Sequence, residues 1–333
     1  MRACLPVIAC LLASLQFATA EGARPNVLLI AIDDLNDWVS CLGGHPQAAT
    51  PNIDRLAARG TLFTNAHCQA PICNPSRSSV MLGLRPSTTG IYLNAPRHWT
   101  VPPLQRSVTL PRHFAANGYV TLTAGKIYHG SGLPKGDFDQ VGPRPGQRNG
   151  DRDKRVQKEL TGLWDFGPQD FPDEEFGDHQ TASWAIGQLS KEHAKPFFLA
   201  LGFYRPHVPW YAPQRWFDSI PAAEVKLPPH RDGDRKDLPP AALALTRNPT
   251  PPPHDWFLDH NRWKLALQSF HASTRFTDEQ LGRVLDALDA SPHKDDTIIV
   301  LYSDHGFHLG EKQRWAKQSL WERSTRVPMI IAA

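Results

Sequence analysis

The segment Cys73-Asn74-Pro75-Ser76-Arg77 combines the residue types best suited to chemistry at one point of the chain. Pro75 favours the first turn of a helix, so Cys73 is expected at or just before a helix N-terminus. Free N–H groups and positive potential at such an end suit an anion, and Arg77 lies one turn further on as a charged donor. A helix N-terminus also lowers a thiol pKa, so a plain thiolate nucleophile is an alternative, although no Cys-His-Asn protease context surrounds Cys73.

Ionisable residues also follow four apolar runs, at the point where each is expected to end as a strand. Ligands of open α/β sheets bind beyond the carboxyl ends of the strands, so these clusters are expected at one mouth. Each cluster alone has a structural alternative, because an Asp-Asp pair often makes a turn or a cap and a lone histidine is usually a surface or core residue. The clusters are Asp33-Asp34, Lys126 with His129, Tyr204 with Arg205 and His207, and Ser303 with Asp304 and His305.

Asp33, Asp34 and Asp304 would bring three carboxylates together at that mouth. Like charges at such a separation repel unless a cation lies among them. Hard oxygen ligands favour calcium or magnesium over zinc, so the sequence predicts a divalent cation of this kind. The alternative is that the three residues cap separate helices and never meet.

The segments that must position these residues alternate between two periodicities. Continuous apolar runs suit parallel strands covered on both faces, and helical periodicity separates them. The sequence therefore predicts an α/β fold with a mostly parallel central sheet and helices on both faces. The predicted strands are 26–32, 119–124, 197–203, 297–302 and 327–331, and the predicted helices are 50–60, capped by Thr50, 109–117, 181–193 and 262–290.

Two stretches break this alternation. Residues 142–155 are polar, Gly-rich and basic, and residues 221–254 contain nine prolines with little periodicity. Both are predicted surface excursions and candidates for facing a substrate.

The composition is that of a folded, exported protein. Charged residues make up 21% of the 333 residues, and 36 Lys and Arg against 33 Asp and Glu exclude a polybasic arm for nucleic acid. A basic start, an apolar run at 5–17 and a small-x-small end predict that residues 1–20 are a signal peptide, with a lipoprotein signal ending at Cys10 as the alternative. No later segment is apolar enough for stable membrane insertion, so a secreted or periplasmic location is expected.

Three cysteines remain after the predicted signal peptide, namely Cys41, Cys68 and Cys73. An odd number leaves at least one sulfur unpaired. Cys41 and Cys68 are interpreted as small buried residues or as one disulfide.

Taken with the segments around it, the Cys73 motif resembles the type I, formylglycine-dependent sulfatases of the alkaline phosphatase superfamily. The resemblance runs from Arg24 to Ala333, and RPHVP (205–209) and WAK (315–317) are most similar to the iduronate-2-sulfatase branch. The matching segments are NVLLIAIDD (26–34), TPNIDRLAARG (50–60), CNPSR (73–77), GKIYHG (125–130), KPFFLALGFYRPHVP (195–209), TDEQLGRVLDAL (277–288) and SDHGFHLGEK (303–312).

This resemblance implies roles for individual residues. Cys73 would be oxidised to formylglycine by a formylglycine-generating or equivalent maturing enzyme, and the hydrated aldehyde would be the nucleophile. His207 or Lys317 would protonate the departing sugar oxygen, and His129 would remove the proton whose loss expels sulfate. The implied catalytic residues are Cys73, Arg77, Lys126, His129, His207 and Lys317, and the implied calcium ligands are Asp33, Asp34, Cys73, Asp304 and His305.

The resemblance also implies which reaction the protein catalyses and how much of a complete family member the chain covers. The expected activity is removal of sulfate from a sulfated carbohydrate, such as a glycosaminoglycan or another polysaccharide or oligosaccharide. The alternatives are a phosphate or phosphonate monoester hydrolase of the same superfamily and an inactive anion-binding fragment. Family members continue further with a C-terminal subdomain, so residues 24–333 are interpreted as a truncated N-terminal catalytic domain with an uncovered last strand at 327–331. Met81-Leu82-Gly83 stands where the family often has Leu-Thr-Gly, a departure that bears on recognition by the maturing enzyme.

Overall fold

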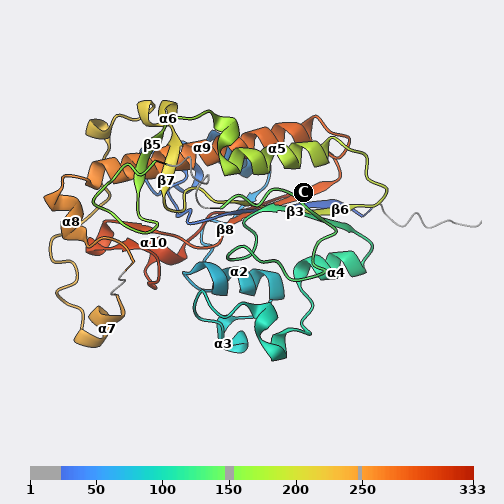
Figure 1. Cartoon of the computed structure of the whole chain (residues 1–333), viewed down its shortest axis with the longest axis horizontal. Coiled ribbons are helices and arrows are strands. Elements are labelled where there is room, and N and C mark those ends of the chain that lie inside the picture. Colours follow the sequence, from blue (N-terminus) through green and yellow to red (C-terminus); the bar gives the residue numbers. More distant parts are fainter. Residues whose placement is uncertain (1–23, 147–153, 247–249) are drawn as a thin grey trace, which may run out of the picture.

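A seven-stranded sheet forms the middle layer of the computed structural model, which describes residues 24–146, 154–246 and 250–333 (Figure 1). The predicted signal peptide and the centre of the 142–155 excursion lie outside the described residues. In spatial order the strands are β2 (Thr61–Leu62), β11 (Met329–Ala332), β8 (Thr297–Ser303), β1 (Asn26–Ile32), β6 (Phe197–Phe203), β3 (Val120–Gly125) and β4 (Gln140–Val141). Two small sheets pair β5 (Phe166–Gln169) with β7 (Trp210–Pro213), and β9 (His308–Leu309) with β10 (Trp315–Ala316).

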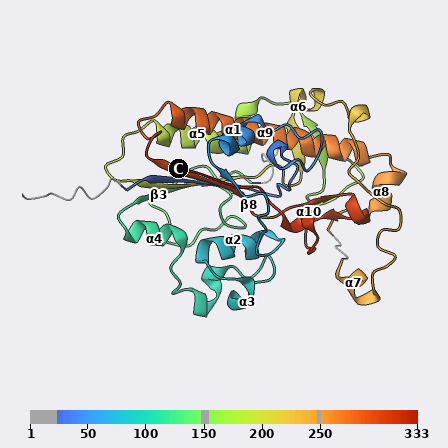
Figure 2. The same cartoon turned by 180° about the vertical axis from the view of Figure 1, so that it is seen from behind.

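Helices cover both faces of the main sheet, which confirms the predicted α/β class (Figures 1 and 2). On one face lie α1 (Pro51–Ala58), α5 (Gly177–Leu189) and α9 (Trp263–Asp289), and on the other lie α2 (Cys73–Leu82) and α4 (Leu110–Ala116). The shorter helices are α3 (Pro86–Thr89), α6 (Gln214–Asp218), α7 (Pro240–Leu245), α8 (His254–Asp259) and α10 (Glu322–Thr325). No helix among the described residues is both long enough and apolar enough to cross a bilayer.

Alternate residues of β1 enter two different cores, as a strand buried on both faces requires. Leu28, Ile30 and Ile32 pack in the core that contains residues of α1, α5 and α9. Leu29 and Ala31 pack on the opposite face with residues of α2 and α4. Because β1 pairs in parallel with β6 and β8, and β6 with β3, the carboxyl ends of these four strands meet at one edge of the sheet.

The last strand differs from the prediction. β11 pairs antiparallel with β8 on one side and with β2 on the other, so it is not an uncovered edge. The partner β2 is only two residues long and follows α1 directly, and a segment this short carries no strand periodicity to read. The antiparallel β11 is the reason why the sheet is mostly rather than wholly parallel.

Two helix ends also differ from the sequence prediction. α1 begins at Pro51 as expected, but the Thr50 hydroxyl bonds Ser40 and makes no cap. The carboxylate of Asp278 on α9 accepts the N–H groups of Asn52 and Ile53 instead, at 3.0 and 2.9 Å. α5 begins at Gly177, four residues before the predicted start at 181.

Cys41 and Cys68 are both free, so their interpretation as a disulfide is wrong. Both are partly buried, and burial raises the pKa of Cys41 to about 11 and that of Cys68 to about 12. They are packed thiols held in the unreactive neutral form.

Candidate active site

Three of the predicted clusters contribute to one hollow beyond the carboxyl ends of β1, β3 and β6, beside the N-terminus of α2, and the fourth, with Asp304 and His305, is buried next to Cys73. The hollow has a volume of about 360 Å³, and Asp34, Cys73, His129, His207 and Lys317 all line it. This arrangement confirms that these stretches, far apart in the chain, share one mouth. The remaining lining residues are Ile72, Asn94, Leu163, Trp164, Val208, Thr250, Phe307, Ala316 and Gln318.

Cys73 is the first residue of α2 and is 1% exposed. Its Sγ lies 3.2 Å from Lys317 Nζ, 3.3 Å from His305 Nε2 and 3.7 Å from Lys126 Nζ. Burial alone would raise the pKa of the Cys73 thiol, but Lys126, Lys317 and His305 together hold that pKa well below its usual value. The position therefore favours negative charge, as the helix N-terminus predicted.

The three carboxylates lie together, so the alternative in which they never meet is wrong, and each of them also pairs with a cation. Lys317 Nζ lies 2.6 Å from Asp34 Oδ1, and Arg77 Nε lies 2.8 Å from Asp304 Oδ2. Lys126 Nζ pairs with Asp33 Oδ2. The carboxylates also touch through the backbone, since the N–H of Asp34 donates to Asp304 Oδ1 at 3.2 Å.

The cations set the pKa values of these buried acids. Burial would raise the pKa of Asp33, but Lys126, His207 and Arg77 together outweigh it and lower that pKa. At Asp304 burial dominates and raises the pKa to about 6, against the opposing effect of Arg77. Burial would lower the pKa of His305, but Asp304 and Cys73 together raise it.

The donor set fits a hard divalent cation. Ligand atoms of Asp33, Asp34, Cys73 and His207 lie within 4.8 Å of one another, and so do those of Asp33, Cys73, Asp304 and His305. Asp34 Oδ2 is buried without a hydrogen-bond partner. Carboxylate oxygens suit calcium, whereas the sulfur of Cys73 suits it only once an oxygen has replaced it.

Arg77 and Lys126 lie behind Cys73 rather than in the lining of the hollow. Both are 1% exposed. Arg77 donates to the backbone carbonyl of Lys126 and, at 3.3 Å, to that of Ile127, so its donors hold protein groups in place. The Nζ of Lys126 also faces the Tyr204 ring, 5.1 Å from its centroid. Sequence reasoning assigned Tyr204 no role, although its place beside Arg205 and His207 was the available signal.

The backbone around the site adopts conformations that ordinary residues rarely take. Asp34, Ala316 and Gln318 have φ values of 63°, 69° and 67°, and the last two flank Lys317. Such residues cost on the order of 1–3 kcal/mol each and persist where the surroundings over-determine them. Gly202 is required for a different reason, since a Cβ there would lie 1.9 Å from the carbonyl oxygen of Lys126.

The two predicted excursions behave differently. Thr250 of the 221–254 segment lines the hollow, so that segment reaches the site. That segment also contains the short helix α7, which the sequence reading missed. In the other excursion, Arg144 donates to the backbone carbonyl of Gly130 at 3.1 Å, and Arg155 to that of Leu160 at 3.0 Å. These two arginines therefore stabilise loops.

A family model described as Sulfatase matches residues 25–333. The chain belongs to the sulfatase family. A protein named Sulfatase from Formosa agariphila is 43% identical over 328 residues, which cover 94% of this chain and 64% of that protein. Human Iduronate 2-sulfatase is 34% identical over 336 residues, which cover 92% of this chain and 59% of that protein. This sulfatase-family chain thus spans about three fifths of the length of these relatives.

A solved structure supports the fold of this sulfatase-family chain. The phosphonate monoester hydrolase of Agrobacterium radiobacter superposes with a TM-score of 0.75, covering 92% of this chain and 68% of that one. The sequences are 22% identical, so this likeness bears on the fold alone.

Proposed function

We propose that the chain hydrolyses the sulfate esters of a sulfated saccharide. The observation that carries the proposal is the position of Cys73 Sγ at a helix N-terminus, 3.2 Å from Lys317 Nζ and 3.3 Å from His305 Nε2, at a hollow that Asp34 also lines and next to the buried carboxylates of Asp33 and Asp304. A sulfate ester is an anion, and this positive potential favours its binding. The family relatives support sulfate as the group removed, and one of them is named for iduronate, a sugar acid.

Two groups complete the proposed site. The first is formylglycine made from Cys73 by a maturing enzyme, and its hydrated aldehyde supplies a hydroxyl nucleophile. The second is a calcium ion held by Asp33, Asp34 and Asp304, with His305 and the modified residue 73 beside them, and it supplies positive charge against the sulfuryl oxygens. The fit of the carboxylate cluster to a hard cation supports the ion.

Lys317 is the best placed group to bind the sulfuryl oxygens. Its side chain is 14% exposed and its Nζ is within reach of both Asp34 and Cys73. Lys126 contributes a second positive charge from beneath, 3.7 Å from the sulfur. Charges held in place in this way stabilise a transition state without reorganising.

His207 and His129 are the two proposed proton carriers. The carbonyl oxygen of Val208 lies 2.6 Å from His207 Nδ1, so this nitrogen carries a proton and donates it. His207 lines the hollow, with Nε2 3.9 Å from Asp34 Oδ2, and in the imidazolium form Nε2 carries a second proton that serves the departing sugar oxygen. His129 lines the same hollow as Cys73, and its Nδ1 is buried without a hydrogen-bond partner, which suits it to accept a proton from the group at position 73.

Space next to the site supports a saccharide substrate. A second hollow of about 790 Å³ shares Ile72 and Gln318 with the first. Tyr92, Trp321 and Arg85 line it, and Tyr92 is 60% exposed. Aromatic faces and a cation suit further sugar residues of an anionic chain.

The apolar run at 5–17 supports export of the protein to the periplasm or the medium.

Sulfate release from a panel of sulfated saccharides tests the proposal, with phosphate and phosphonate monoesters in parallel. We expect sulfate release by the full chain, an aldehyde mass at residue 73 and no turnover by Cys73→Ala. Phosphate release without sulfate release would favour the monoester hydrolase, whose name the structural neighbour carries. An unmodified thiol without any turnover would favour an anion-binding chain, and full activity of Cys73→Ala would refute the nucleophile.

A further inference from the structure

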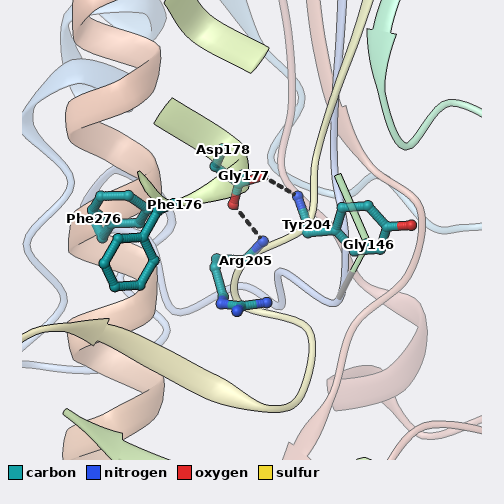
Figure 3. A pocket seen from close by; sticks show the side chains of 7 residues that line it. All are labelled: Gly146, Phe176, Gly177, Asp178, Tyr204, Arg205 and Phe276. Carbon is teal, nitrogen blue, oxygen red and sulfur yellow. Dashed lines mark hydrogen bonds between the residues drawn. The ribbon is translucent and has the colours of Figure 1, made fainter. Parts of the chain in front are cut away.

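A buried carboxylate on α5 holds the backbone of the segment that carries His207. Asp178 is 3% exposed and lies in the first turn of α5. Its Oδ1 accepts the N–H of Tyr204 at 2.7 Å and its Oδ2 accepts the N–H of Arg205 at 2.8 Å, as Figure 3 shows. Asp178 does not line the active-site hollow, and the reaction outlined above does not use it.

A second contact from α9 holds the same segment. Thr277 Oγ1 donates to the carbonyl oxygen of Arg205 at 3.0 Å. The space around Asp178 amounts to about 10 Å³, and Phe176 and Phe276 are among the residues that line it (Figure 3). That is room for about one water molecule, so the space takes no substrate.

The segment held in this way carries two groups of the active site. The N–H of His207 donates to the carbonyl oxygen of Tyr204 at 2.8 Å, so the imidazole moves with that residue. The ring of Tyr204 faces Lys126 Nζ at 5.1 Å. A displacement of the backbone at 204–205 would therefore move both the proposed proton donor and a neighbour of the buried lysine.

The two contacts use both side-chain oxygens of Asp178 as acceptors. Burial raises the pKa of Asp178, while Arg205 and the two backbone N–H groups oppose that rise. An asparagine keeps the shape but offers one acceptor oxygen and turns an NH2 donor toward an N–H donor. Asp178→Asn therefore removes one of the two contacts and leaves a buried donor unpaired.

We propose that Asp178 is a positioning residue, which holds Tyr204 and Arg205 so that His207 reaches the departing oxygen of the substrate. This inference rests on the proposed sulfatase function and on the role of His207 as proton donor. It predicts that loss of Asp178 lowers kcat most for substrates whose leaving group must be protonated.

Two substrates with different leaving groups test the inference on the full chain. Nitrophenolate departs from 4-nitrophenyl sulfate without a proton, whereas a sugar oxygen needs one. We expect Asp178→Asn to lower kcat for the sulfated saccharide about 10- to 100-fold, because small displacements of catalytic groups cost this much. For the aryl sulfate the loss should stay within about 3-fold, because proton donation contributes little there.

A matched variant controls for loss of stability. Asp278 is 2% exposed and accepts the consecutive N–H groups of Asn52 and Ile53, but α1 carries no residue of the site. Asp278→Asn should lower the melting temperature, and any loss of kcat should be the same for the two substrates. Thr277→Val removes the contact from α9 and should also lower kcat more for the sulfated saccharide than for the aryl sulfate. This variant keeps the inference testable if Asp178→Asn does not fold.

The outcomes distinguish this inference from the proposed function. The role of Asp178 would be overturned if Asp178→Asn lowered kcat equally for both substrates. It would also be overturned if Asp278→Asn lowered kcat more for the saccharide than for the aryl sulfate. A wild-type chain that releases sulfate from no ester would instead overturn the proposed function.

Discussion

Loss of one carboxylate from the cluster of Asp33, Asp34 and Asp304 is expected to abolish stabilisation of the fold by calcium. Asp34 is the residue to change, because its Oδ2 has no hydrogen-bond partner and its Oδ1 pairs with Lys317, the least buried of the three cations. Asp33→Asn would leave Lys126 buried without its ion pair, and Asp304→Asn would remove the closer of the two carboxylates that pair with buried Arg77. Such an unpaired charge costs about 3–5 kcal/mol and would obscure the effect of the metal.

The size of the effect follows from linkage between binding and folding. Calcium at 100 times its dissociation constant stabilises the folded state by about 2.7 kcal/mol. Unfolding gains about 2.1 cal/mol/K per residue, or roughly 650 cal/mol/K for the roughly 310 residues beyond the predicted signal peptide. The ratio of these two quantities is a rise in melting temperature of about 4 °C.

Thermal unfolding of the full chain in calcium and in EDTA measures this shift without any need for activity. We expect about 4 °C for the wild type and less than about 1 °C for Asp34→Asn. Asp37→Asn is the control, because Asp37 lies on the same loop but pairs with Arg323 and Arg326. It should lower the melting temperature and keep the calcium shift. An undiminished shift in Asp34→Asn, or none in the wild type, would show that this cluster is not a calcium site.

Two further predictions concern a single charge each. Lys317→Met should lower kcat/KM for a sulfated saccharide about 100- to 1000-fold, the usual cost of losing one oxyanion donor. Lys312→Met, which removes a lysine paired with Asp234 outside the hollow, should change it less than about 2-fold; equal losses would argue against sulfate binding by Lys317. His271 stacks on Trp38, and burial, with His45 and Arg275 nearby, lowers its pKa to about 3. The unfolded chain binds this proton below about pH 6.5, so stability should fall as the pH drops from about 6.5 to about 3, by about 2 kcal/mol at pH 5. Denaturant unfolding at pH 7 and pH 5 should show that His271→Phe loses this component, and an unchanged pH dependence would contradict the assignment.

Local patterns were sufficient to predict the five longest strands of the main sheet and the polar residues that follow several of them. The apolar run of β1 and the helical periodicity of α9 fall within a residue or two of their observed bounds, because each pattern records burial on particular faces. The Cys73 motif likewise predicted a helix start, because the fixed φ of Pro75 suits the first turn of a helix whatever the rest of the fold. Parallel pairing then places strand ends together, which is why the mouth of the site could be predicted before any contact was known.

Contacts between distant segments required the tertiary structure. The pairing of Lys317 with Asp34 spans 283 residues, and the contact from Asp178 to the N–H of Tyr204 joins a helix start to a loop beyond the next strand. No local pattern shows that Arg77 donates hydrogen bonds to Asp304 and to backbone carbonyls. Nor does a local pattern show that Asp278, rather than Thr50, caps α1. Periodicity specifies which face of an element is buried, whereas the partner of a buried charge depends on which elements the folded chain brings within about 4 Å of it.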